Sequence, residues 1–468
     1  MNQEKEAYDL VVIGGGPGGY TAAVRARQLG MRVALIERET LGGVCLNWGC
    51  IPTKALLRQA EVWSLLSRGG EFGFALSGAK YDWQQVVDRS RDTADGLAQG
   101  VAFLMKKNGV DVLNGTGRVT PLRKVEVRDN VDAVAHVLEA NHILIATGST
   151  PRSLPGIEID GEHIISSRQA MVLESLPSDI LIVGAGAIGV EFAYFFNAFG
   201  SRVTLLESLP QILPREDEEA AESLRASLER QGVAVETDAR VRGVEVLSDG
   251  VQVGYEMGGG KREVTVERVL MAVGVSGQSR GLGLEALGVR MRDGAIEIDE
   301  RQQTSVEGIW AIGDVAGPPQ LAHVASAEGI AAVDFMAGRS RLGVDRNVVP
   351  NCIYSHPQVA SVGLSEAEAL AQGLDVKVGR FPFAASGKAR AAGETEGFVK
   401  LVFGSRYGEL LGGVIVGAEA TELIGELALG LRLEATYEEL LHTIHAHPTM
   451  AEGIMEAAGE AFGEAINI

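Results

Sequence analysis

The chain has 468 residues, 46% of them hydrophobic, and this length predicts about three domains at roughly 150 residues each. Its formal net charge of −20 disfavours nucleic acid as a partner, because phosphates attract clusters of Lys and Arg. Three cysteines are too few for a disulfide-stapled secreted fold, and the charged start at residues 1–6 leaves no room for a signal peptide, so we expect a cytoplasmic protein.

The first recognisable unit is a βαβ pattern near the N-terminus. A β-branched run at residues 8–14 leads into Gly14, Gly16 and Gly19, followed by a helix to about residue 30 and a strand that ends at Glu37. Glycines at these positions let the backbone approach a pyrophosphate, which rests on the N-terminal end of the helix. Glu37 can accept hydrogen bonds from a ribose, and the alternative is a solvated strand end. The pattern predicts a dinucleotide-binding fold.

Two cysteines follow this unit, Cys45 and Cys50. On an ideal helix, Cα atoms five residues apart lie roughly 8 to 9 Å from each other, whereas a disulfide needs less than about 7 Å. Pairing therefore requires a bent segment, and Gly42, Gly43 and Gly49 supply backbone that bends easily. The alternative is a pair of buried free cysteines that act as apolar filler.

A second copy of the βαβ pattern begins at residue 179. It contains Gly184, Gly186 and Gly189 and ends at Glu207, which follows Gly184 by the same 23 positions that separate Glu37 from Gly14. A carboxylate at Glu207 would repel a 2′-phosphate, so this site should prefer NAD to NADP. The helix of this copy is apolar, but a glycine turn and Glu191 interrupt the run, and we predict no membrane span.

The two nucleotide folds need different cofactors. The first leads directly into the cysteines, and a flavin can accept electrons from a thiolate, whereas nicotinamide reacts by hydride transfer. We therefore expect FAD in the first fold and NAD in the second.

The C-terminal part carries candidate proton chemistry. From about residue 347, strand-like runs at 397–403 and 412–416 alternate with a helical pattern at 420–433, which predicts an α+β domain. His447 precedes Pro448, and an imidazole can take a thiol proton and return it near neutral pH. Glu452 could orient that imidazole. His442 and His445 are the competing candidates.

Taken together, these motifs resemble one family, the two-cysteine pyridine nucleotide-disulfide oxidoreductases. The matching segments are residues 43–54, 145–149, 184–192, 311–314 and 445–449 with Glu452. The resemblance implies an α/β fold with two Rossmann-like dinucleotide-binding domains and a C-terminal α+β dimerisation domain. The implied boundaries are 1–150 and 275–346 for the two segments of the FAD domain, 151–274 for the NAD domain and 347–468 for the dimerisation domain.

The resemblance also implies roles for the candidate residues. Cys45 would exchange with the substrate and Cys50 would pass electrons to the flavin from a redox-active disulfide, while Lys54 would pair with Glu191 beside the flavin. His447 would act on the disulfide of the other subunit of a homodimer, with Glu452 orienting it. Lys54 could equally be a surface lysine.

Further positions match cofactor-binding residues of the family. Those of the FAD site are Gly43, Val44, Lys54, Gly117, Thr147, Gly148, Ser149, Asp314, Leu321, Ala322 and His323. Those of the NAD site include Val241 and Gly274. No metal is implied, and Asp314 has the alternative of an ordinary turn former. Residues 275–278 depart from the family, whose members usually have an arginine and a Pro-Asn pair there, so hinge geometry or NAD affinity could differ.

The implied substrate is a dithiol carried by a lipoyl-bearing protein of a 2-oxoacid dehydrogenase or glycine cleavage complex. A glutathione reductase should show arginines near Glu207, which residues 205–210 lack, and a mercuric-ion reductase or large thioredoxin reductase should end in a cysteine or selenocysteine pair, which residues 462–468 lack. A soluble transhydrogenase lacks the cysteine pair. The alternative outside the enzymes is a catalytically silent nucleotide-binding scaffold.

Overall fold

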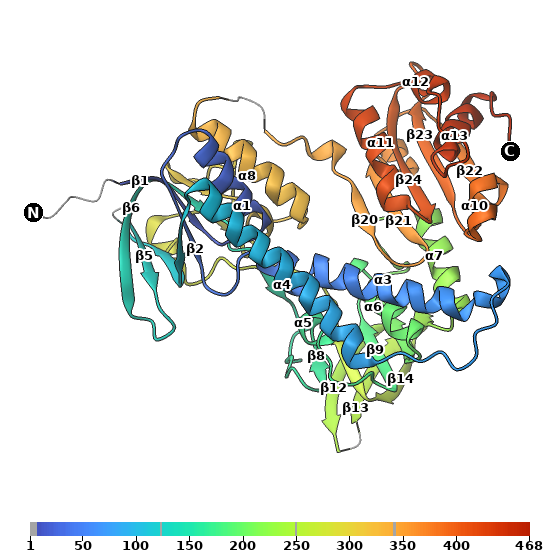
Figure 1. Cartoon of the computed structure of the whole chain (residues 1–468), viewed down its shortest axis with the longest axis horizontal. Helices are drawn as coiled ribbons and strands as arrows, with labels where there is room; N and C mark the ends of the chain where they lie inside the picture. The colour runs from blue at the N-terminus through green and yellow to red at the C-terminus, as the bar shows by residue number, and fades with distance from the viewer. Residues whose placement is uncertain (1–6, 122–123, 249, 340–342) are drawn as a thin grey trace, which may run out of the picture. The chain divides into compact units, whose positions relative to one another are not determined.

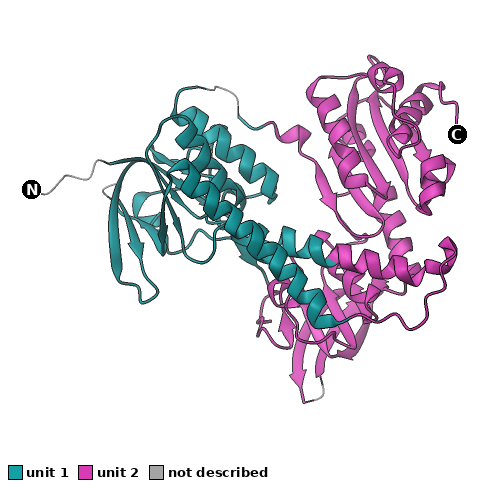
Figure 2. Ribbon diagram, viewed as in Figure 1, with its two compact units in different colours: residues 1–56, 82–152, 274–344 teal, residues 57–81, 153–273, 345–468 magenta. Residues whose placement is uncertain are grey.

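The computed structural model describes residues 7–121, 124–248, 250–339 and 343–468 (Figure 1). Figure 2 shows its two compact units, each built from three stretches of chain. The first unit combines residues 1–56, 82–152 and 274–344, and the second combines 57–81, 153–273 and 345–468. In the described residues, no helix combines the length and apolarity that crossing a membrane requires.

The first unit is built on a parallel sheet that is buried on both faces. Leu10 and Val12 belong to one apolar cluster and Val11 and Ile13 to another, as expected for a strand whose side chains alternate between two covered faces. The parallel strands, in spatial order, are β3 (Asp111–Asn114), β2 (Val33–Glu37), β1 (Tyr8–Ile13), β6 (Val134–Ile145) and β19 (Ile309–Ala311). An antiparallel extension adds β5 (Lys124–Arg128) and β4 (Thr116–Val119), and the long helices are α1 (Pro17–Gln28), α4 (Trp83–Asn108) and α8 (Ala322–Met336).

The second unit contains its own parallel sheet. The strand order is β11 (Ala234–Glu236), β10 (Arg202–Leu206), β9 (Asp179–Val183), β15 (Arg268–Met271) and β8 (Ile164–Ile165), with helices α6 (Ala187–Ala198) and α7 (Glu218–Arg230). A separate antiparallel sheet holds β12 (Arg240–Leu247), β13 (Gly250–Met257) and β14 (Gly260–Val266). The succession β9, α6, β10 repeats β1, α1, β2, which confirms the predicted duplication.

The second unit also contains the C-terminal part, a helix-covered antiparallel sheet. Its order is β20 (Asn351–Ile353), β21 (Gln358–Gly363), β24 (Leu410–Gly417), β23 (Phe398–Gly404) and β22 (Val376–Pro382), and its helices include α11 (Ala420–Arg432), α12 (Tyr437–His442) and α13 (Glu452–Phe462). Helix α13 lies directly on β22, since a Cβ at Gly379 would be 1.8 Å from the Ala457 carbonyl oxygen. The α+β prediction for this region is confirmed.

Shorter elements connect these layers. They include α2 (Gly43–Trp48), α3 (Cys50–Ser67), β7 (Ser149–Pro151), α5 (Ser167–Ala170), β16 (Val275–Gly277), β17 (Met291–Arg292), β18 (Ala295–Ile296), the 3₁₀ helix η3 (Gly313–Ala316), α9 (Glu366–Ala371) and α10 (Gly387–Ala392). Three residues of the divergent segment at 275–278 form strand β16, which pairs with β7.

Candidate active site

The first nucleotide loop joins β1 to α1 and has the shape that a pyrophosphate requires. Gly14 has a φ of +111°, which favours glycine, and a Cβ at Gly19 would lie 1.9 Å from the Gly14 carbonyl oxygen. Beside Gly16 there is room, because the atom nearest to a Cβ there would be 3.9 Å away. A closely packed loop with one open glycine before a helix N-terminus fits a dinucleotide such as FAD.

Glu37, at the end of β2, holds this loop in place. Its Oε2 accepts a hydrogen bond of 2.7 Å from the Gly15 amide, and its Oε1 accepts one of 2.8 Å from the Glu39 amide. A carboxylate has about four acceptor positions. Glu37 can therefore stabilise the loop and still accept hydrogen bonds from a ribose.

The second nucleotide loop repeats this geometry. A Cβ at Gly189 would lie 1.9 Å from the Gly184 carbonyl oxygen, whereas one at Gly186 would meet nothing within 4 Å. The buried Glu207 accepts a hydrogen bond of 2.8 Å from the Ala185 amide. The loop therefore has room for the pyrophosphate of a second dinucleotide.

Two other residues predicted for the NAD site are less clearly placed. Val241 lies on β12 in the second unit, the unit that also contains the Gly184–Gly189 loop. Gly274, with a φ of +98°, is assigned to the first unit. A Cβ at Gly184 would lie 2.5 Å from the Ala272 carbonyl oxygen and 3.3 Å from the Val273 amide nitrogen, so Gly274 directly follows residues that pack on this loop, and its contact with NAD stays a prediction.

The two cysteines lie on either side of a broken helix. Helix α2 contains Cys45 and ends at Gly49, whose φ of −151° and ψ of −115° are not helical, and α3 begins at Cys50. The predicted bend is therefore present. The side chain of Cys45 is hydrogen bonded to that of Cys50, and the disulfide between them stays a prediction. This hydrogen bond and burial raise the pKa of the Cys45 thiol, while the positive charge of Lys54 opposes them.

The cysteine segment is fastened to the first nucleotide loop. The Gly42 amide donates a hydrogen bond of 2.8 Å to the Gly15 carbonyl, and a Cβ at Gly43 would lie 2.7 Å from the Gly16 Cα. Val44, which follows, is about half exposed. The dithiol is thus next to the loop that we assign to FAD.

Tyr20, in the first turns of α1, is a neighbour of this dithiol that the motifs did not reveal. Burial raises its pKa, and the charges of Cys45 and Cys50 raise it further, so the phenol is within electrostatic range of both thiols. Its position directly after Gly19, on the turn of α1 next to the loop, is the signal that could have identified it.

The predicted turn at Thr147–Ser149 lies between β6 and β7. The Thr147 hydroxyl donates a hydrogen bond of 2.7 Å to the Gln278 carbonyl, and the Ser149 hydroxyl donates a short one to Asp314 Oδ2. Burial raises the pKa of Asp314, partly offset by this hydrogen bond from Ser149. The structure therefore brings together predicted FAD residues that are 165 positions apart.

Helix α8 contributes to the same region. Leu321 is its N-cap, Ala322 and His323 form its start, and Glu328, further along the helix, is buried. Oε2 of Glu328 accepts a hydrogen bond of 2.7 Å from the Gly313 amide, directly before Asp314. Glu328 was missed because a single acid inside an apolar helix has no motif around it.

Gly117 and the Lys54–Glu191 pair complete the predicted set. Gly117 packs against a side chain of the sheet, since a Cβ there would lie 2.8 Å from Ile13 Cγ2, and its contact with FAD stays a prediction. Glu191 is 4% exposed and accepts a hydrogen bond of 2.9 Å from the Tyr354 amide. Lys54 and Glu191 belong to different units, and their pairing stays a prediction.

His447 and Glu452 form an oriented pair at the start of α13. His447 Nδ1 is 2.8 Å from Glu452 Oε1, and the Thr449 amide donates a hydrogen bond of 2.8 Å to Oε2. Burial raises the pKa of Glu452, but the Thr449 amide and His447 outweigh it and hold that pKa below its ordinary value. With Nδ1–H directed to a carboxylate, Nε2 is the basic nitrogen, and the His447 side chain is 79% exposed.

His445 has a different environment. Its Nε2 is 2.8 Å from Glu426 Oε1 and its Nδ1 is 2.9 Å from the Thr443 carbonyl oxygen. Both partners are acceptors, so this environment favours the imidazolium, in which both ring nitrogens carry hydrogen. The hydrogen bond to Glu426 raises the pKa of His445. His445 is thus unsuited to act as a base.

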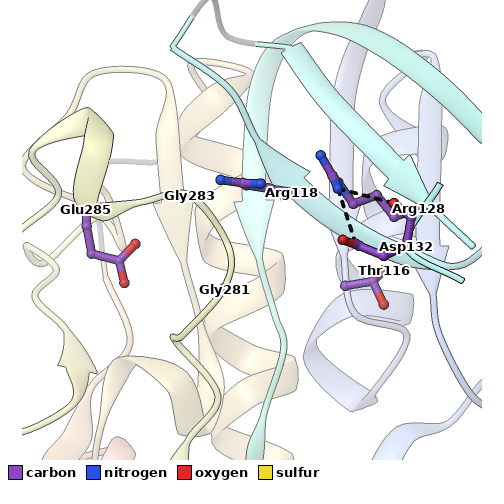
Figure 3. A pocket seen from close by; sticks show the side chains of 7 residues that line it. All are labelled: Thr116, Arg118, Arg128, Asp132, Gly281, Gly283 and Glu285. Atoms are coloured by element: carbon purple, nitrogen blue, oxygen red, sulfur yellow. Dashed lines mark hydrogen bonds and ion pairs between the residues drawn. The ribbon is translucent and has the colours of Figure 1, made fainter. Parts of the chain in front are cut away.

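A surface pocket of about 350 Å³ lies elsewhere in the first unit (Figure 3). Its lining residues are Thr116, Arg118, Arg128, Asp132, Gly281, Gly283 and Glu285. Arg128 is paired with Asp132 at 3.2 Å. None of the predicted site residues lines this pocket, and the described residues contain no cluster of His, Cys, Asp and Glu suited to a metal ion.

Comparisons with known proteins match this architecture. Residues 8–329 match the family model of pyridine nucleotide-disulphide oxidoreductases, and residues 349–458 match the dimerisation domain of that family. The chain is 47% identical to the dihydrolipoyl dehydrogenase of Rhizobium etli, covering 99% of both chains, and 43% identical to that of Bacillus subtilis, covering 98% of this chain and 99% of the relative.

Solved structures agree with the fold. LpdA from Mycobacterium tuberculosis is similar with a TM-score of 0.89 at 29% identity, covering 96% of this chain and 98% of that one. The HOCl-induced flavoprotein disulfide reductase RclA from Escherichia coli has a TM-score of 0.86 at 29% identity, covering 97% and 99%.

Proposed function

The chain belongs to the pyridine nucleotide-disulphide oxidoreductases, in the group of the dihydrolipoyl dehydrogenases, and on this premise we propose that it oxidises protein-bound dihydrolipoamide to lipoamide and reduces NAD. The observation that carries the proposal is the position of the dithiol. Cys45 and Cys50 are in hydrogen-bond contact on a segment whose Gly43 packs on Gly16 of the first nucleotide loop. A dithiol beside a flavin loop is what electron transfer between the two requires.

The protein's own residues account for the thiol chemistry. In the oxidised enzyme a substrate thiolate attacks Cys45 of a Cys45–Cys50 disulfide, the S–S bond breaks, and Cys50 leaves as a thiolate. The second substrate thiol then attacks the mixed disulfide, which releases lipoamide and the Cys45 thiol. His447 Nε2 takes the proton from the substrate thiol, since the thiolate is the nucleophile, and Glu452 stabilises the imidazolium that forms. The charge of Lys54 favours a thiolate at this site.

FAD and NAD, when bound, carry the electron pair away from the dithiol. We assign FAD to the loop at Gly14–Gly19, with Glu37, the Thr147–Ser149 turn and Asp314 as its further contacts. We assign NAD to the loop at Gly184–Gly189. Glu207 supports NAD over NADP, because its buried carboxylate would repel a 2′-phosphate.

We further propose that two copies of the chain form the working enzyme. Residues 349–458 match a dimerisation domain, and this region exposes large apolar side chains, with Leu429 60%, Leu433 70% and Ile444 98% exposed. Ile444 is three residues from His447, so a surface that covers it also covers the proposed base. His447 would then serve the dithiol of the partner. The lipoyl-bearing protein and a cytoplasmic location are parts of the same proposal, and the low cysteine count favours the latter.

A steady-state assay tests the reaction class. We expect yellow protein that turns over dihydrolipoamide with NAD and is inactive with oxidised glutathione and NADPH. Reduction of oxidised glutathione with NADPH would instead indicate a glutathione reductase. Colourless protein without turnover would support a catalytically silent scaffold.

Alkylation before and after treatment with NADH tests the disulfide. Two thiols that react only after reduction, mapped to Cys45 and Cys50, are expected. Equal labelling of both before and after reduction would exclude a redox-active pair.

A further inference from the structure

The segment at Val275–Gln278 is where this chain departs from the family that it resembles. Its strand β16 pairs antiparallel with β7, so that Ser276 lies opposite Thr150 and Gly277 opposite Ser149. This pairing places the divergent residues directly against the turn that we assign to the flavin site, within the first unit.

Both the backbone and the side chain of Gln278 form hydrogen bonds with that turn. Its amide donates a hydrogen bond of 2.8 Å to the Gly148 carbonyl, and its own carbonyl accepts one of 2.7 Å from the Thr147 hydroxyl. Nε2 of Gln278 donates one of 3.0 Å to the Ser149 carbonyl, and Oε1 accepts one from Arg38. Arg38 directly follows Glu37, so one side chain connects the turn to the end of β2.

The preceding residue, Gly277, contacts a second part of the same site. A Cβ at Gly277 would lie 3.1 Å from the Val315 Cα and 3.2 Å from the Asp314 carbonyl oxygen. Asp314 in turn accepts the hydrogen bond from the Ser149 hydroxyl. The divergent segment is therefore packed against both partners of the Ser149–Asp314 hydrogen bond.

We propose that the Gln278 side chain is a positioning residue of the flavin site, which holds the Thr147–Ser149 turn and Arg38 in the arrangement that receives FAD. A primary amide suits this task, since it offers a donor and an acceptor from one group. The proposal rests on the assignment of the turn and of Asp314 to FAD in the proposed function. According to this proposal, the residues at 275–278 that differ from the family affect how tightly the protein binds FAD.

Replacing Gln278 by Leu tests the proposal, because Leu keeps the volume and removes both side-chain hydrogen bonds while the backbone ones remain. FAD should dissociate about 10-fold more readily, the effect of two ordinary hydrogen bonds. The measurements are the FAD dissociation constant of reconstituted apoprotein and the rise in melting temperature that FAD produces. A purely structural role would lower the melting temperatures of apo- and holoprotein equally and leave that rise unchanged.

Gln84→Leu is the matched control, since Gln84 is an exposed glutamine of the same unit whose Nε2 hydrogen bonds to Asp88. Its FAD affinity should equal that of the wild type. Arg38→Met provides a second variant, and with Gln278→Leu it should weaken FAD binding by less than the product of the two single effects, because both remove the same contact.

Wild-type FAD affinity in Gln278→Leu, or fully independent effects of the two substitutions, would overturn the positioning role. The failure of the proposed function is distinguishable, since it would appear as wild-type protein that binds no FAD.

Discussion

At the scale of single residues, the histidines at 445 and 447 show how two identical side chains acquire different chemistry. The side chain of His445 is 5% exposed and has an acceptor at each nitrogen, so its protonated form is stabilised. His447 has one nitrogen on Glu452 and is exposed, so it can exchange a proton with a substrate. The two histidines differ in their surroundings, since Glu426 contacts the buried His445 and Glu452 contacts the exposed His447.

His447→Gln should therefore remove the proposed base. We expect kcat with dihydrolipoamide to fall by about 10²- to 10⁴-fold, the usual contribution of general base catalysis, with FAD content unchanged. His442→Gln is the control, because His442 is exposed at the end of α12. Loss of activity in the control but not in His447→Gln would assign the base to His442.

His445 should contribute to stability in a pH-dependent way. Because its hydrogen bond to Glu426 raises its pKa in the folded protein, the stabilisation is fully present below the unfolded value of about 6.5. It is lost as the pH rises through the folded pKa. His445→Gln should lower the free energy of unfolding by about 2 kcal/mol at pH 6, as for a hydrogen bond to a charged group, and by less at pH 9. Urea unfolding at the two pH values measures this, and a difference that grows with pH would contradict the assignment.

At the scale of elements, the attachment of α2 to the first nucleotide loop is the arrangement on which the proposed electron path depends. Gly43 has a φ of +58° and lies against the Gly16 Cα, while Gly49 ends α2 between the two cysteines. Neither position has room for an ordinary side chain, since a Cβ at Gly49 would lie 3.0 Å from the Val44 carbonyl oxygen.

Gly43→Ala should push the cysteine segment away from the loop. We expect a loss of about 2 kcal/mol in the free energy of unfolding, from overpacking and positive φ, together with reduced flavin content and turnover. Gly96→Ala is the control, because Gly96 lies within α4 and a Cβ there meets nothing within 4 Å. Flavin absorbance per subunit and urea unfolding give the readouts, and normal flavin content with normal turnover in Gly43→Ala would argue against this attachment.

At the scale of the whole molecule, the proposed base and the proposed dithiol are far apart in sequence and belong to different units of the chain. The exposure of His447 and Ile444 favours a site completed by a second copy. A subunit that lacks Cys45 and a subunit that lacks His447 should then complement each other.

Coexpressed Cys45→Ser and His447→Gln chains test this directly. Each variant alone should be inactive, whereas random mixing into twofold dimers gives one intact site in each mixed dimer, or roughly a quarter of the wild-type sites. Activity of the mixture near that level is expected. A mixture as inactive as its parents would place His447 and Cys45 of the same chain in one site.

Much of this organisation is readable from local sequence. The two glycine patterns, their glutamates 23 positions later and the strands around them predicted two parallel folds, because a βαβ unit is contiguous and its turns demand glycine at set positions. Helix geometry predicted a bend between Cys45 and Cys50 on the condition that they pair, and the structure has that bend at Gly49. The roles of individual residues came from the resemblance, and the four-part division of the chain stays a prediction.

Tertiary structure alone decided which distant residues meet. Gly43 packs on Gly16, Gln278 is hydrogen bonded to the Thr147–Ser149 turn, and Ser149 is hydrogen bonded to Asp314. No repeat or periodicity in the sequence predicts any of these contacts. Sequence patterns report the backbone conformation of continuous segments, whereas contacts between separate elements depend on how completed sheets and helices pack. For that reason Tyr20, Glu328 and Gln278 became visible as parts of the site only in the folded molecule.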